Sequence, residues 1–169
     1  MTSASLESPA PAVIDPTLFR SVLSRFASGV TVVTSRDERG TDYGMTVSAF
    51  SSLSLEPPLV LVCIDQSATW HSVLPDATHF NVHVLGAEQE PISRRFASDR
   101  ADRFVDVSHT RNPHGIVQLT GVLALLECRI TARYAGGDHT IVIGEVEHAH
   151  ADQGDPLLYF CGAYERINR

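Results

Sequence analysis

The spacing of apolar residues along the chain first predicts a helix, over residues 16–28. Asp15 is a suitable N-cap, and Pro16 at the first helical position loses no hydrogen bond. Gly29 follows where helices commonly end in a left-handed turn. We therefore expect one amphipathic helix packed on an apolar partner. Its apolar positions are Leu18, Phe19, Val22, Leu23 and Phe26.

After this helix the apolar period changes to two, which is typical of strands. Polar turns separate the strand-like runs, and Pro57 and Pro58 interrupt the chain before a continuous apolar run. The predicted strands are residues 30–35, 43–50, 59–64, 80–85, 121–131, 140–149 and 157–161.

Only two further helices are predicted, a short one from Ser67 that Pro75 ends and one with a basic face within 88–104. Because helices do not regularly separate the strands, a parallel doubly wound sheet is disfavoured. The pattern favours a mainly β fold, an antiparallel sheet of about six strands closed or nearly closed into a barrel.

Length and charge narrow the class of protein. A chain of 169 residues with 43% hydrophobic residues suits one domain, over 16–169, preceded by a disordered N-terminal arm over 1–15. The net charge of −7 disfavours nucleic acid and anionic membrane partners. The longest apolar run, residues 59–64, is too short to span a bilayer.

The cysteines and the N-terminal arm indicate a cytoplasmic protein. Cys63, Cys128 and Cys161 are odd in number, far apart and set among apolar residues, as expected of buried thiols in a reducing compartment. Residues 1–15 lack the basic start and apolar stretch of a secretory signal.

A hydroxyl-rich segment, residues 46–54, is the densest polar feature, with five Ser or Thr side chains in nine residues. Hydroxyl and backbone N–H groups at this density suit the edge of a heterocycle or a phosphate. The alternative is a strand end whose hydroxyls satisfy local backbone groups. Sequence motifs of the usual nucleotide-binding loops and of the serine nucleophile elbow are absent from the chain.

A glycine turn at residues 136–139 places His139 at the rim of the sheet, with Asp138 close enough to influence it. An imidazole there suits a ligand contact, but an ordinary turn before a polar strand start explains the pattern as well.

The basic helix carries four arginines that suit either contacts to a phosphate or a solvated helix face. They are Arg94, Arg95, Arg100 and Arg103.

Two pairs of histidines lie on shared strand faces, His79 with His83 and His148 with His150. Zinc requires a third ligand and a supporting shell, and neither lies nearby in the sequence. We therefore expect no metal site.

Three separated segments then carry a resemblance to a known family. They are Phe-Ala-Ser-Gly-Val-Thr-Val-Val-Thr at 26–34, Gly-Met-Thr-Val-Ser-Ala-Phe-Ser-Ser-Leu-Ser-Leu-Glu-Pro-Pro-Leu-Val at 44–60, and Gly-Asp-His-Thr at 137–140 followed by Ile-Gly-Glu-Val at 143–146. Together they resemble the flavin reductase-like family, in consistent order over about residues 16–166. The resemblance implies a homodimeric split β-barrel of Greek-key type that binds FMN or FAD.

The same resemblance implies roles for individual residues. Asp65 and Ser67 are expected near the flavin tail or phosphate, and Phe96 at the flavin or its lid. His139 matches the family's histidine at the NADH site, and Gly137 lets the turn approach it. The residues expected to line the isoalloxazine and ribityl chain are Thr46, Val47, Ser48, Ser51 and Ser52.

One position departs from the family pattern, since His83 stands where the family typically has Asn. No role is carried over to it.

The activity that the resemblance implies is hydride transfer from NADH, with NADPH as the alternative donor, to a flavin. The flavin then passes in reduced form to a separate monooxygenase. The alternatives are a non-catalytic flavin-binding split-barrel protein and a pyridoxamine-phosphate-oxidase-like flavoprotein.

Overall fold

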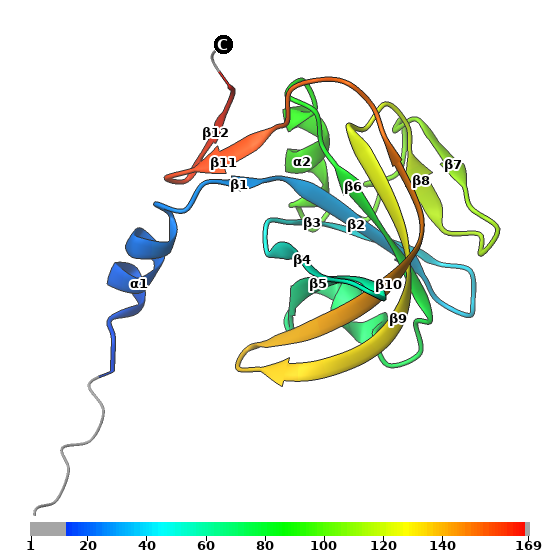
Figure 1. The fold of residues 1–169 in the computed structure, drawn as a ribbon, viewed down its shortest axis with the longest axis horizontal. Helices are drawn as coiled ribbons and strands as arrows, with labels where there is room; N and C mark the ends of the chain where they lie inside the picture. The colour runs from blue at the N-terminus through cyan, green and yellow to red at the C-terminus, as the bar shows by residue number, and fades with distance from the viewer. Residues whose placement is uncertain (1–12, 168–169) are drawn as a thin grey trace, which may run out of the picture.

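The computed structural model describes residues 13–167, so most of the predicted N-terminal arm lies outside the described residues. Its centre is an antiparallel sheet with the strand order β3-β2-β6-β9-β10-β5-β4 (Figure 1). This confirms the mainly β, antiparallel class. The seven strands are β2 Thr31–Arg36, β3 Asp42–Val47, β4 Phe50–Leu55, β5 Pro58–Asp65, β6 His79–Val84, β9 Ala124–Gly136 and β10 His139–Ala151.

The large sheet has seven strands where six were predicted, and hydrogen bonds do not close it within residues 13–167. Its edge strands β3 and β4 are consecutive in sequence and joined only by Ser48 and Ala49. The amide of Phe50 donates to the carbonyl of Ser48 over 3.0 Å, so the chain bends sharply and β4 pairs with β5 instead of with β3. The edge strands β3 and β4 therefore meet at one corner of the sheet without backbone hydrogen bonds pairing them as neighbouring strands.

Among the residues that the structure describes, three short helices accompany the sheet: α1 Pro16–Leu23, the 3-10 helix η1 Thr69–Val73, and α2 Glu90–Phe96. Asp15 caps α1 as predicted, since its carboxylate accepts the amides of Thr17 and Leu18 at 2.9 Å. Two of the predicted helices are too long, because α1 ends before residue 28 and α2 covers only part of 88–104.

The predicted apolar partner of α1 is not found among the described residues. Phe19 is 50% exposed, Val22 60% and Phe26, just beyond the helix, 81%. Figure 1 shows α1 standing apart from the large sheet, joined to it through β1, Ser28–Gly29. Helix α1 is amphipathic as predicted, but its apolar face is left uncovered by residues 13–167.

Two small sheets complete the described fold. One joins β1 to β11, Leu158–Phe160, and β12, Ala163–Glu165. The other is a hairpin of β7, His109–Arg111, and β8, Val117–Leu119. Apart from β11, these short strands carry too few residues for a periodic signal, and the sequence did not predict them.

The interior holds two apolar clusters. One lies within the curve of the large sheet around Trp70 and Phe80, and the other lies under α2 around Phe96 and Leu85. Of the three thiols, Cys128 is buried, which raises its pKa to about 12, whereas Cys63 is half-buried and Cys161 is exposed. The expectation of three buried thiols is therefore wrong for Cys161.

Within residues 13–167, every helix is too short or too polar to cross a bilayer.

Candidate functional site

The candidate site is built where β5 ends beside the start of β10. Asp65 lies opposite His139 in the register, and the amide of Gln66 donates to the carbonyl of Asp138 at 3.0 Å. The β9–β10 turn consists of Gly137 and Asp138, and Gly137 has a φ of 71°, which favours glycine. The predicted glycine turn is thus confirmed, and strand pairing fixes it next to Asp65.

His139 is oriented by its neighbour. Its Nδ1 lies 2.7 Å from the carboxylate of Asp138. A hydrogen on Nδ1 donates to that carboxylate, so Nε2 is left as the acceptor nitrogen of the neutral ring. The arrangement provides a hydrogen-bonding imidazole at the rim, held in one tautomer.

Asp65 is held as an anion. Its carboxylate accepts the backbone amide and the hydroxyl of Ser67, each at 2.7 Å. These two hydrogen bonds, and the nearby rings of His139 and His71, lower the pKa of Asp65 below its ordinary value. An anionic acceptor favours hydroxyl or N–H groups of a ligand and repels phosphate.

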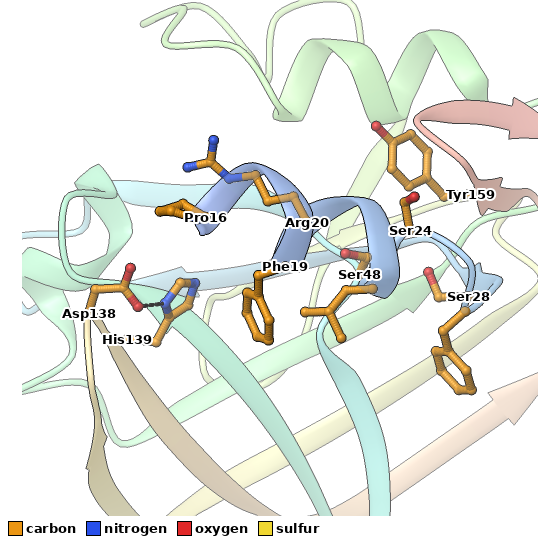
Figure 2. A pocket seen from close by; sticks show the side chains of 11 residues that line it. Pro16, Phe19, Arg20, Ser24, Ser28, Ser48, Asp138, His139 and Tyr159 are labelled. Carbon is orange, nitrogen blue, oxygen red and sulfur yellow. Dashed lines mark hydrogen bonds and ion pairs between the residues drawn. The ribbon is translucent and has the colours of Figure 1, made fainter. Parts of the chain in front are cut away.

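A cavity of about 480 Å³ opens between α1, the β9–β10 turn and the link between β3 and β4 (Figure 2). Ser48, Asp138 and His139 line it from the sheet side. One residue of the hydroxyl-rich segment and the predicted imidazole therefore share a single cavity. The residues that sequence reasoning missed are Phe19, Arg20 and Tyr159, which also line it.

The other members of the hydroxyl-rich segment do not share one surface. Thr46 donates its hydroxyl to the carbonyl of Ser93 in α2 at 2.6 Å, and Val47 is buried in the core. Ser51 and Ser52 are exposed on the edge strand β4, where the Ser51 hydroxyl donates to the carbonyl of Ser52 at 3.0 Å. Local backbone bonding explains Thr46, while Ser48 faces the cavity.

A second cavity, of about 190 Å³, lies between η1 and α2. Thr46, Trp70, Phe96 and Arg103 are among its lining residues, although Phe96 itself is buried in the core. Arg103 donates to the carbonyls of Gly44, Ser98 and Arg100.

The basic face of the predicted second helix serves mainly to hold its own loop. Besides Arg103, Arg95 donates to the carbonyl of Val105. The other two arginines pair with carboxylates, Arg94 with Glu90 and Arg100 with Asp102. These arginines therefore stabilise local structure rather than forming a free basic patch.

His83, the departure from the family pattern, is fully buried. Its Nδ1 lies 2.9 Å from the carbonyl of Val32, and its Nε2 has no hydrogen-bond partner among the described residues. Burial lowers its pKa to about 4, so the ring is neutral in the folded protein. It is not among the residues that line the cavity described above.

Comparison with known proteins identifies the family. Residues 23–168 match the model of the flavin reductase like domain, so the chain belongs to the flavin reductase-like family. The match includes Ser48, Asp65 and the turn that bears His139.

Two curated relatives and one solved structure show how far the likeness extends. The chain is 44% identical over 151 residues to FMN reductase (NADH) SmoA of Agrobacterium fabrum, covering 89% of this chain and 86% of SmoA. It is 43% identical over 153 residues to the reductase component of 4-hydroxyphenylacetate 3-monooxygenase of Thermus thermophilus, covering 88% of this chain and 95% of that protein. The structure of the Streptomyces globisporus C-1027 NADH:FAD oxidoreductase SgcE6, with NAD and FAD fragments, superimposes with a TM-score of 0.86 at 38% identity, covering 93% and 97%.

Proposed function

We propose that this protein is an NADH-dependent flavin reductase that reduces FMN or FAD and supplies the reduced flavin to a separate monooxygenase. The observation that carries the proposal is the single cavity lined by Ser48 and by the Asp138–His139 pair. Family membership and the names of SmoA and the Thermus reductase component support it. A bound flavin would accept at N5 the hydride that the nicotinamide gives up, and this is the chemistry the cofactor supplies.

The residues on the cavity side fit a flavin held loosely enough to leave. Ser48 lines the cavity, and Ser51 and Ser52 lie exposed on the strand β4 that follows it, so all three offer neutral hydroxyls. Neutral contacts do not trap a product as several ion pairs would. The hydroxyl of Thr46 already donates to the carbonyl of Ser93, and the apolar side chain of Val47 is buried, so Thr46 and Val47 would act through their backbone. Together, the residues of this segment would position the flavin edge next to the nicotinamide. Hydride transfer needs no general base.

The rim residues fit the nicotinamide nucleotide and the polar tail of the flavin. His139 presents a hydrogen-bonding nitrogen, and Gly137 lets the turn approach the ligand because a side chain is absent there. Asp65 and Ser67 suit the hydroxyl groups of a flavin tail, since Asp65 accepts hydrogen bonds but repels phosphate. Phe96 shapes the second cavity from the core.

The charge of the rim favours NADH over NADPH. Asp138 is 89% exposed on its side chain, and the anionic Asp65 lies opposite the adjacent His139 in the β5–β10 pairing. The additional phosphate of NADPH would meet both carboxylates, and Arg20 on α1 is the one arginine among the described residues that line the cavity.

The uncovered face of α1 favours a homodimer in which a second copy covers it and helps to wall the cavity. Leu18, Phe19 and Val22 are at least half exposed, which is unusual for one contiguous face. With a second copy in place, the curved sheet corresponds to the split β-barrel of the family. A reductase that uses NADH and free flavin also fits a cytoplasmic location.

The test is steady-state kinetics in which NADH and NADPH are crossed with FMN, FAD and riboflavin. We expect NADH oxidation that depends on added FMN or FAD, with a higher kcat/KM for NADH than for NADPH. Absence of turnover with either flavin would overturn the proposal. A tight yellow complex inert to NADH would indicate the flavin-binding alternative, and oxidation of pyridoxamine phosphate would indicate the oxidase alternative.

A further inference from the structure

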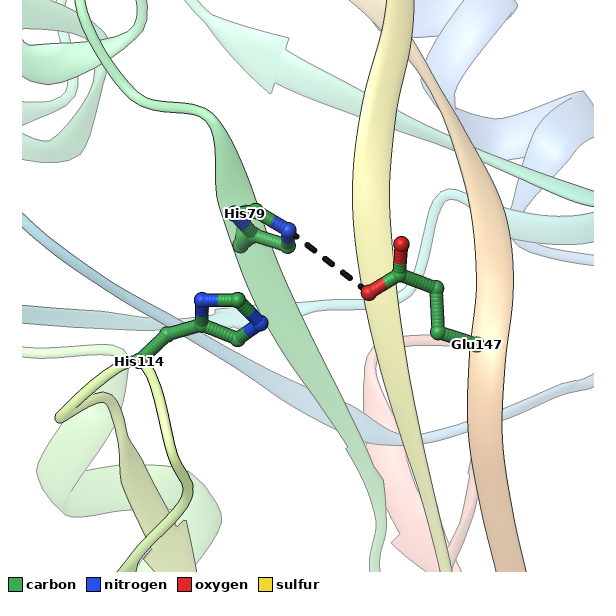
Figure 3. A group of neighbouring side chains, drawn as sticks. All are labelled: His79, His114 and Glu147. Carbon is green, nitrogen blue, oxygen red and sulfur yellow. Dashed lines mark ion pairs between the residues drawn. The ribbon is translucent and has the colours of Figure 1, made fainter.

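A cluster of two imidazoles and a carboxylate lies on the outside of the large sheet (Figure 3). His79 begins β6, Glu147 lies in β10, and His114 lies in the loop between β7 and β8. Nε2 of His79 is 3.6 Å from Oε2 of Glu147, and the two imidazole rings stack with centroids 3.8 Å apart. Metal-binding atoms of all three residues lie within 4.8 Å of one another.

We propose that His79, His114 and Glu147 form a binding site for one divalent transition-metal ion of the zinc type. Two imidazoles and one carboxylate are a ligand set that Zn²⁺ prefers, and a water would fill the fourth tetrahedral position. Ligand atoms of a tetrahedral zinc site lie about 3.3 Å apart, so the three ligand atoms, which now lie within 4.8 Å of one another, would move closer together as the His114 ring turns.

The supporting shell that the sequence did not reveal is present in the fold. Nδ1 of His79 lies 2.9 Å from the hydroxyl of Thr78, which directs Nε2 toward the site. Arg129 holds Oε1 of Glu147 at 3.2 Å, so Oε2 is the oxygen left for an ion. Partners of this kind fix ligand orientation and contribute to metal affinity.

The backbone also presents the ligands. Glu147 falls at a break in the β9–β10 register, where Val146 and His148 pair with consecutive residues of β9 and Glu147 has no partner. Such a bulge redirects a side chain. The loop that carries His114 is pinned by the buried side chain of Asn112, whose Oδ1 accepts the amides of His114 and Ile116 at 3.0 and 2.9 Å.

The surrounding charge favours a cation. Asp37, Glu38 and Asp76 line the adjoining cavity together with His79 and His114, and these three acidic residues outnumber the two nearby cations, Arg36 in the same lining and Arg129 on Glu147. Binding requires the His114 ring to turn out of the stack. The residue is exposed, and its ring makes no hydrogen bond with any residue in 13–167, so this rotation meets little resistance.

The site is separate from the proposed reductase site. Glu147 lies eight residues along β10 from His139, about 26 Å at the usual strand rise. An ion there would join β6, β10 and the β7–β8 loop, which are distant in sequence. It would therefore stabilise the fold and leave turnover unchanged.

The test is calorimetric titration of untagged, chelator-treated full-length protein with Zn²⁺, with melting temperature and NADH oxidation measured in parallel. We expect one Zn²⁺ per chain and a rise in Tm of about 5–11 °C at a hundredfold excess over Kd. His114→Ala and Glu147→Gln should each weaken binding at least about tenfold, and Thr78→Val should weaken it less. His148→Ala, an exposed histidine on the same strand, is the matched control and should bind as the unmodified protein does.

Two results would overturn the site. One is the absence of a stoichiometric Zn²⁺ in the unmodified protein. The other is equal affinity in His114→Ala, Glu147→Gln and the His148→Ala control, because that pattern would place the ion elsewhere. Since NADH oxidation is measured on the same samples, failure of the metal site and failure of the reductase proposal are distinguishable.

Discussion

Strand β10 begins at the exposed cavity rim and, five residues later, crosses the most crowded part of the interior. At the rim, a Cβ added to Gly137 would meet no atom within 4 Å, and the residue is glycine because its φ is positive. At Gly144, a Cβ would lie 2.6 Å from the Phe80 ring and 2.8 Å from Cβ of Cys128. The turn before β10 thus has open space around it, whereas the middle of β10 has no room for an additional atom. Substitutions at the two glycines should therefore differ in their effect on stability.

The largest effect is expected at Gly144. Gly144→Ala forces Phe80 or Cys128 to move within a packed core and should cost about 3 kcal/mol of the free energy of unfolding. Gly137→Ala is the matched control and should cost about 1 kcal/mol, since only the left-handed conformation opposes it. Urea unfolding followed by circular dichroism measures both. Equal losses would show that the interior yields to the added methyl group.

A pH-dependent loss of stability is expected from the buried His83. Its folded-state pKa of about 4 lies below the ordinary 6.5, so the unfolded chain binds a proton that the folded protein does not. The free energy of unfolding therefore falls as the pH drops below 6.5. The stability that comes from keeping His83 neutral is lost completely below about pH 4. Between pH 7.5 and 5 the loss should be roughly 2 kcal/mol.

Urea unfolding at several pH values measures this loss, with His83→Asn as the comparison because Asn does not titrate. The variant should show a shallower pH dependence, whatever its stability at neutral pH. Identical slopes for the two proteins would mean that His83 is not held neutral by burial.

At the rim, a smaller and purely functional effect is expected. His139→Ala should raise the KM for NADH about tenfold, equivalent to about 1.4 kcal/mol, with flavin affinity nearly unchanged. His148→Ala, farther along the exposed part of β10, should leave both constants as they are. Steady-state kinetics and a flavin titration measure the two constants separately. If flavin affinity fell by the same factor, His139 would belong to the flavin site instead.

The smallest effect concerns the hydroxyl-rich segment. Ser48→Ala should weaken flavin binding about fivefold, because a neutral hydrogen bond contributes about 1 kcal/mol. Ser51→Ala should have a smaller effect, since the Ser51 hydroxyl already bonds to the Ser52 carbonyl. Fluorescence titration of FMN and FAD compares the variants. Unchanged affinity in both would leave the hydroxyls as partners of local backbone groups.

The local elements that the sequence predicted are those with strong short-range signals. Asp15 and Pro16 determined where α1 begins, and the two glycines before Asp138 determined the β9–β10 turn. Strand β4 was missed because the run Ser51-Ser52-Leu53-Ser54 has no apolar alternation, and its place follows from pairing with β5. The hairpin of β7 and β8 was missed for a similar reason, being too short for a period.

The sequence by itself determined the class of the protein, through the family motifs, and the residues that can bond to a ligand, such as Ser48 and His139. The tertiary structure alone decided which of them meet. Pairing of β5 with β10 brings Asp65 opposite His139, and the sharp bend after Ser48 turns that residue into the same cavity. Likewise, His114 and Glu147 reach His79 only because strand register and the β7–β8 loop unite segments that local sequence patterns cannot connect.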